Sequence, residues 1–154
     1  MPQNLFSKRL IISFSLVILA LAPVAQATTY SAATAKRWLA LTLSGNLLLL
    51  TGPVPVGAVI RAELHLDGTV TGREAGNVGG QHADETTTGT FTGNGDCNGA
   101  AMVSSYEDGQ LVRTSMLALI FNDNSKQVRM VQKSLLLPDG TSLPVTVLIE
   151  GRKK

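Results

Sequence analysis

Two polar side chains, Arg113 and Ser115, lie in the longest apolar stretch of the second half of the chain, residues 111–121. Alternate side chains of a strand point to opposite faces, so both share a face with Leu117 and Phe121. If that face lines an interior, the two polar groups lie in a mostly apolar lumen, as in many small-molecule pockets. Arg113 and Ser115 are therefore candidate ligand-binding residues, with Tyr106 on the preceding strand as the third.

The opposite arrangement of the same strand turns Val112, Met116 and Ile120 inward and leaves Arg113 on the surface. The sequence does not separate the two arrangements, because both faces are apolar from residue 117 onward. We favour the arrangement with Arg113 on the surface and keep the inward arrangement as the alternative.

Metal-binding patterns are incomplete. The segment 94–99, Asn-Gly-Asp-Cys-Asn-Gly, begins like a calcium loop, but its twelfth position is Ser105, where a bidentate carboxylate is required. A hairpin turn is the expected structure there. His82 and Asp84 would share a face of an extended chain, but two ligands do not make a site. We expect no metal and no cofactor.

Catalytic patterns are equally scarce. The chain has no G-x-S-x-G motif and no P-loop lysine. The adjacent carboxylates Asp84 and Glu85, like Glu107 and Asp108, would point to opposite faces of a strand, so neither pair suits acid–base catalysis. An enzyme is therefore the least expected of the function classes.

The chain has one cysteine, Cys97, which excludes an intramolecular disulfide and zinc sites built on paired cysteines. In an exported protein an odd cysteine is either a free thiol or an intermolecular link. Cys97 is thus a candidate for an intermolecular disulfide.

The N-terminus has the three zones of a signal peptide over residues 1–27. Lys8 and Arg9 form the positive region, residues 10–22 form an apolar run, and Ala25 and Ala27 form an A-x-A cleavage site. The run of 13 residues is short for a membrane span, which needs about 20, although an uncleaved anchor is the alternative. We expect export to the periplasm or beyond the cell.

Charge argues against a nucleic-acid partner. Loss of residues 1–27 takes the 13 basic residues of the chain to 11, equal to the 11 acidic ones. A nucleic-acid-binding protein needs a basic excess on one face. The one basic cluster, residues 152–154, is expected to be a solvated tail.

The remaining residues, 28–154, predict a single all-β domain. Alternation is clearest over residues 56–67, where Ala58, Ala62 and Leu64 are among the apolar residues of one face, before a turn at Asp67-Gly68. Residues 53–55, Pro-Val-Pro, are expected at an edge or in a crossing loop. The predicted strands cover residues 37–44, 56–67, 69–79, 84–93, 100–106, 111–121, 126–136 and 143–150.

About eight antiparallel strands with short turns form a meander, and such a meander removes its edges by closing into a barrel. A β-sandwich is the alternative. An eight-stranded barrel is just wide enough to be filled by side chains or to hold one small ligand. Few aromatic residues remain for the girdles of a membrane barrel, so we expect no membrane partner after cleavage of the signal peptide.

Two stretches carry a resemblance: residues 52–72, ending Leu-Asp-Gly-Thr-Val-Thr-Gly, and residues 88–100, Thr-Gly-Thr-Phe-Thr-Gly-Asn-Gly-Asp-Cys-Asn-Gly-Ala. Together they resemble functionally uncharacterised exported bacterial small β-proteins that have a "GTYTVNADCTGT"-like hairpin. The resemblance implies a calycin-like or allene-oxide-cyclase-like barrel and implies no activity. The turn at Asp67 is shorter than in that pattern.

Two functions remain for such a chain. The leading hypothesis is a structural or interaction module whose partner is another protein. The alternative is a carrier that holds a small apolar ligand in the barrel lumen.

Overall fold

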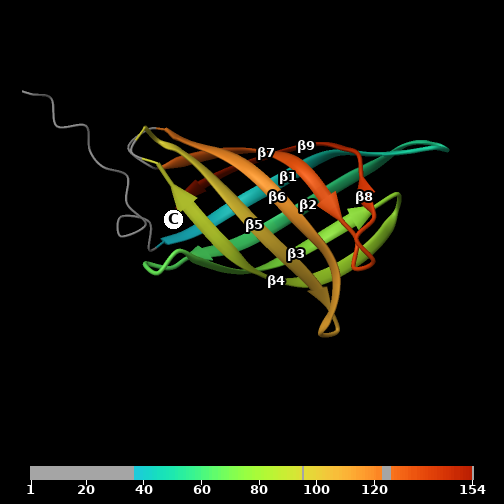
Figure 1. Cartoon of the computed structure of the whole chain (residues 1–154), viewed down its shortest axis with the longest axis horizontal. Coiled ribbons are helices and arrows are strands. Elements are labelled where there is room, and N and C mark those ends of the chain that lie inside the picture. Colours follow the sequence, from blue (N-terminus) through green and yellow to red (C-terminus); the bar gives the residue numbers. More distant parts are fainter. Residues whose placement is uncertain (1–36, 95, 123–125, 154) are drawn as a thin grey trace, which may run out of the picture.

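The computed structural model describes residues 37–94, 96–122 and 126–153, which form a closed antiparallel β-barrel (Figure 1). The predicted signal peptide, with Ala25 and Ala27, lies outside the described residues. Within those residues no helix is long and apolar enough to cross a membrane. The strands are β1 (Arg37–Leu49), β2 (Gly52–Leu64), β3 (Thr69–Val78), β4 (Gln81–Gly93), β5 (Asn98–Glu107), β6 (Gln110–Asn122), β7 (Gln127–Leu136), β8 (Ser142–Leu143) and β9 (Val145–Lys153).

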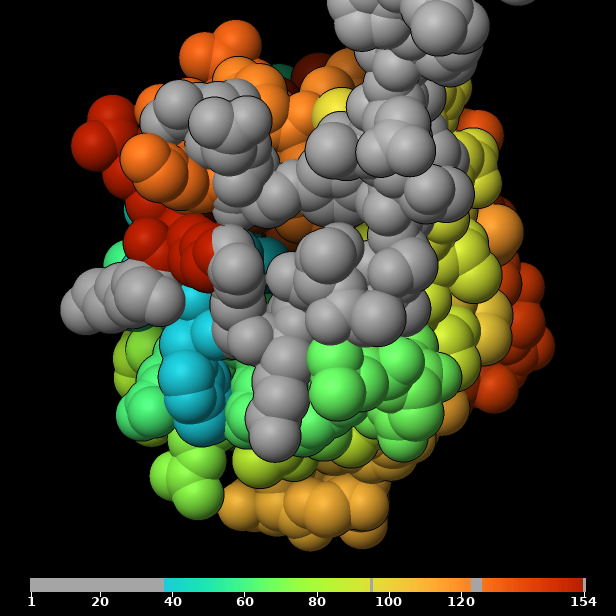
Figure 2. Space-filling model, turned by 90° about the vertical axis from the view of Figure 1, so that its left-hand side faces the viewer, coloured from blue at the N-terminus to red at the C-terminus, as the bar shows by residue number. Residues whose placement is uncertain are grey.

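Each strand from β1 to β7 pairs with the next one along the chain, and β9 closes the ring between β7 and β1. The short β8 pairs only with the end of β7. Seen end-on, the red of β9 lies beside the blue of β1 (Figure 2). The predicted closed barrel is therefore confirmed, and the sandwich alternative is wrong.

The period of two in the sequence decides which side chains fill the barrel. On β2, Ala58, Ala62 and Leu64 are buried, whereas Val59 and Arg61 between them are exposed, as predicted. The buried core gathers mainly toward the end of the barrel where β1 begins. Its largest members are Leu39, Phe91, Leu117, Leu119, Phe121 and Met130.

Two glycines allow neighbouring strands to approach closely. A Cβ atom added to Gly45 would collide with the carbonyl oxygen of Thr146, and one added to Gly89 would collide with that of Met102. Any larger residue would force neighbouring strands apart, since backbone atoms cannot rotate away as a side chain can. Both glycines therefore help to close a barrel of small radius.

Two irregularities in register change which side chains face inward. Arg113 pairs with Ser105 but Leu111 pairs with Tyr106, so Val112 is an extra residue on β6. Lys133 is likewise extra on β7, because the partners of Met116 and Leu117 are Ser134 and Gln132. Each bulge shifts the alternation of its own strand.

One local prediction was confirmed and two were wrong. Residues 53–55 lie at an edge, as predicted, because this end of β2 pairs with β1 while β3 has already ended at Val78, opposite Val56. The backbone carbonyl of Pro55 accepts a hydrogen bond from Gly79, beyond the end of β3. A missing N–H therefore costs no ladder hydrogen bond there. Arg152 and Lys153 belong to β9 and do not form a tail. His82, which lies between the predicted strands 69–79 and 84–93, belongs to β4.

Candidate functional site

Arg113 faces the barrel lumen, so the favoured surface position was wrong. It lies on the same inner face of β6 as the buried Leu117 and Phe121. Strict alternation holds from Arg113 to Phe121, and the wrong choice arose because both faces of this strand are apolar. The bulge affects only Val112, which lines the lumen next to Arg113. The inward arrangement, kept as the alternative, is the correct one for Arg113 and Ser115.

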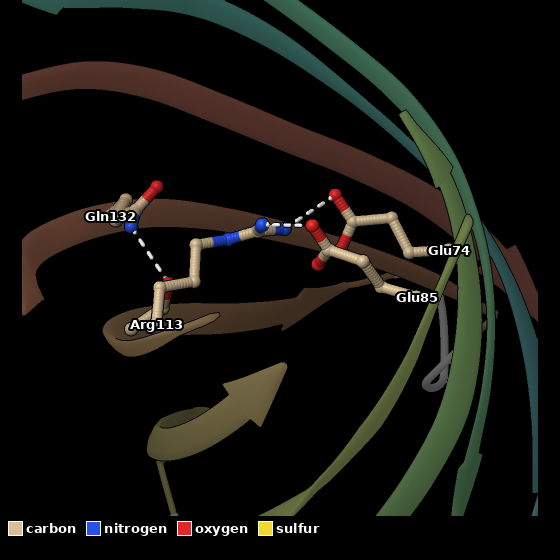
Figure 3. A network of polar contacts seen from close by, with 5 residues as sticks. Glu74, Glu85, Arg113 and Gln132 are labelled. Atoms are coloured by element: carbon tan, nitrogen blue, oxygen red, sulfur yellow. Dashed lines mark hydrogen bonds and ion pairs between the residues drawn. The ribbon is translucent and has the colours of Figure 1, made fainter. Parts of the chain in front are cut away.

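Arg113 joins two acidic side chains inside the barrel. Its Nη1 donates to Oε1 of Glu85 at 2.5 Å, and its Nη2 donates to Oε1 of Glu74 at 2.9 Å. Glu74 on β3 and Glu85 on β4 are direct cross-strand partners, so the guanidinium reaches them from β6 across β5 (Figure 3). We call these three residues the polar cluster.

Burial sets the electrostatics of the cluster. The side chains of Glu74 and Glu85 are 9% and 7% exposed, and that of Arg113 is 19% exposed. Burial raises the pKa of Glu74, and the charge of Glu85 raises it further, while the Arg113 guanidinium acts in the opposite direction. The desolvation of Glu74 is larger than the effect of its cation, so the neutral acid is favoured relative to an exposed glutamate.

A second polar contact adjoins the cluster. Nε2 of the buried Gln132 donates to Oγ of Ser115 at 2.8 Å and lies 3.4 Å from the carbonyl oxygen of Ser134. Gln132 and Arg113 line the lumen side by side (Figure 3). Ser115 accepts the hydrogen bond from Gln132 and also lines the lumen, so its contact with a ligand stays a prediction.

The polar cluster divides the lumen into two cavities. The first, the inner cavity, has about 80 Å³ and mostly apolar walls that include Leu39, Phe91 and Phe121. The second, the mouth cavity, has about 190 Å³ and lies toward the end of the barrel where β3 turns into β4. Its apolar wall includes Leu47, Val56, Ala58, Ala83, Leu135 and Val147, and Glu74, Glu85, Arg113 and Gln132 form its polar part.

The other predicted residues lie apart from this site. Tyr106 lines a groove on the outside of the barrel with Arg73 and Asp84, and neither cavity includes it. Cys97 is half-buried against the core with a φ of 66°, in the turn between β4 and β5. Its intermolecular disulfide stays a prediction.

The aspartate side chains in the turns accept hydrogen bonds from backbone N–H groups. Asp96 accepts hydrogen bonds from the amide N–H and the Nδ2 of Asn98, which lower its pKa and give it the role expected in a hairpin turn. His82 and Asp84 do share a face, 3.4 Å apart and exposed. Among the described residues, no group of three or more His, Cys, Asp or Glu side chains could hold a metal ion.

Glu74, Glu85 and Gln132 were not singled out from the sequence, although one signal was present. Both glutamates lie five positions from the Gly79-Gly80 turn, one on each side, so a two-residue turn places them opposite each other. Glu74 also shares the inward face of Val70, and Glu85 that of Phe91.

We expect the free energy of unfolding of the wild type to fall as pH rises, because of Glu74, and we expect Glu74→Gln to abolish this contribution. Because the pKa of Glu74 is higher in the folded protein than in the unfolded chain, Glu74 stabilises the fold at pH values below the unfolded-state pKa, near 4.5. This stabilisation is lost as the pH rises through the folded-state pKa. Gln does not titrate. The free energy of unfolding in urea should therefore rise for the variant relative to the wild type as the pH is raised from about 4.5 to about 8. Glu150→Gln, exposed on the outer face, is the control and should keep the wild-type profile. An unchanged profile for Glu74→Gln would contradict the assignment.

Comparison with known proteins adds no relative. No family model, no curated protein and no solved structure matches the chain. The resemblance to exported small β-proteins therefore stays a prediction, and the function has to be argued from the barrel.

Proposed function

We propose that this protein binds a small molecule with an apolar body in the mouth cavity, above the polar cluster. The observation that carries the proposal is the lumen itself, which has apolar walls and a few convergent polar groups on one side. Small-molecule sites are built in this way, and the mouths of β-barrels are a common place for them. The proposal takes up the carrier hypothesis.

The two cavities differ in the size of molecule that each can hold. An engineered apolar cavity of about 150 Å³ in another protein binds benzene, so the mouth cavity of about 190 Å³ accepts a molecule of that size or slightly larger. The inner cavity, at about 80 Å³, is too small for such a molecule. Typical drug-sized ligands need about 300 Å³ or more, so a larger ligand would extend out of the mouth.

The probe that tests this is 1-hexanol, measured by isothermal titration calorimetry. We expect a dissociation constant of about 0.1–1 mM, since burial of each CH₂ contributes roughly 0.8 kcal/mol against the cost of association. Ala83→Leu, which fills the mouth cavity, should weaken binding about tenfold or more. Ala75→Leu makes the same change on the outer face and should bind like the wild type.

Two results would overturn the proposal: no heat of binding up to about 10 mM 1-hexanol, or equal affinity in Ala83→Leu and the wild type. In either case the mouth cavity is not a binding site for apolar molecules.

The second candidate, an interaction module, is supported by an exposed apolar surface on the outer face of β5, β6, β7 and β9. Met102 pairs with Met116, Ala118 with Val131, and Val131 with Leu148. Each of these side chains except that of Ala118 is 43% exposed or more, and contiguous apolar surface often marks contact with another protein. Failure of 1-hexanol to bind would favour this candidate.

A further inference from the structure

The polar cluster has more negative than positive groups. Arg113 supplies one positive charge for two carboxyl groups, and both carboxyl side chains are more than nine-tenths buried. Each uses its Oε1 for the guanidinium. An isolated buried charge is expensive unless it is paired and hydrogen-bonded, so a fourth polar group, with a positive charge, would complete the cluster.

The second carboxylate oxygen of Glu85 marks the place for that positive group. This atom, Oε2, is buried and has no hydrogen-bond partner among the described residues. Buried carboxylate oxygens nearly always accept a hydrogen bond, and leaving one without a donor is costly. Glu85 lines the mouth cavity and an outer groove and does not line the inner cavity. Its side chain is buried on the inward face of β4, so a donor would reach it from the mouth.

We propose that the ligand of the mouth cavity is a primary amine, whose ammonium group donates to Glu85 Oε2 while its apolar tail packs against the cavity wall. The inference rests on the proposed function and adds the chemical class of the ligand. An ammonium group brings one positive charge and three N–H donors, which gives two cations for two carboxylates. A carboxylate ligand would add a third negative charge, and an alcohol would donate without balancing charge.

The experiment compares 1-hexylamine, 1-hexanol and hexanoate by calorimetry at pH 7, where the three probes share their six-carbon chain. Hydrogen bonds to charged groups are stronger than neutral ones, so the amine should bind about tenfold tighter than the alcohol, and hexanoate weakest of the three. Glu85→Gln should reduce the preference for the amine over the alcohol to about onefold. Circular dichroism of the variant shows whether it is folded.

Matched variants separate this carboxylate from general surface charge. Asp84→Asn removes a negative charge one residue away on the exposed outer face, and it should keep the tenfold preference for the amine. If Glu85→Gln does not fold, Glu74→Gln is measured in its place. It should also lower the affinity for 1-hexylamine relative to 1-hexanol.

Failure of the inference and failure of the proposed function give different results. Equal binding of amine and alcohol, both weakened by Ala83→Leu, would overturn the amine and keep the site. An amine preference that survives in Glu85→Gln would also overturn the inference. No binding by any of the three probes would overturn both proposals.

Discussion

Arg113→Met is expected to destabilise the barrel by about 3–5 kcal/mol at neutral pH. The substitution keeps much of the side-chain volume but leaves Glu74 and Glu85 opposite each other, buried and without a cation. Removal of one partner from a buried ion pair is far more damaging than replacement of the whole group, because the remaining charges keep their desolvation cost. Urea unfolding followed by circular dichroism measures the loss.

The origin of this loss can be tested in two ways. The destabilisation should shrink in acid, because the raised pKa of Glu74 lets protonation remove one of the unpaired charges. The triple variant Arg113→Met, Glu74→Gln, Glu85→Gln should recover part of the stability at neutral pH. Arg129→Met, in an exposed pair with Glu150, should change stability by no more than about 1 kcal/mol. Wild-type stability in Arg113→Met would contradict the buried cluster.

Phe91→Ala is expected to cost about 3–5 kcal/mol. Phe91 is 4% exposed and meets Phe121 edge-to-face, with ring centroids 5.8 Å apart. Its truncation removes apolar contacts and enlarges the inner cavity, and both effects destabilise the fold. Equilibrium unfolding in urea gives the difference in the free energy of unfolding.

Two variants calibrate this result. Phe91→Leu keeps most of the buried volume and should cost clearly less than Phe91→Ala. Ile120→Ala truncates a side chain that is 56% exposed on the outer face of the same barrel, and a small loss is expected there. A loss below about 1 kcal/mol for Phe91→Ala would mean that the end of the barrel near β1 is not tightly packed.

The barrel could be predicted because its strands follow simple local rules. The alternation over residues 56–64 and the Asp67-Gly68 turn give β2, its inward face and its turn into β3. The edge position of residues 53–55 could be predicted from Pro53 and Pro55, because a proline has no N–H to donate and cannot take part in ladders on both sides of a strand.

The polar cluster could be predicted only in part. The opposition of Glu74 and Glu85 follows from the Gly79-Gly80 turn, since antiparallel register is set by a two-residue turn. The inward positions of Arg113 and Gln132 follow from alternation with Leu117 and with Val128 and Met130, once the inward face is known. On β6 both faces are apolar from residue 117 onward, so no local signal showed which face is inward. The bulges at Val112 and Lys133 had no local signal either, because bulges depend on how the whole barrel closes.

The central claim is that the mouth cavity binds an apolar molecule, and methyl NMR during titration with 1-hexanol tests it most directly. The account predicts shifts at the methyl groups of Ala58, Ala83 and Val147, which line the mouth cavity. The methyl groups of Val59 and Met102, exposed on the outer face, should remain unchanged. Shifts confined to the outer methyl groups, or no shifts at all, would contradict it.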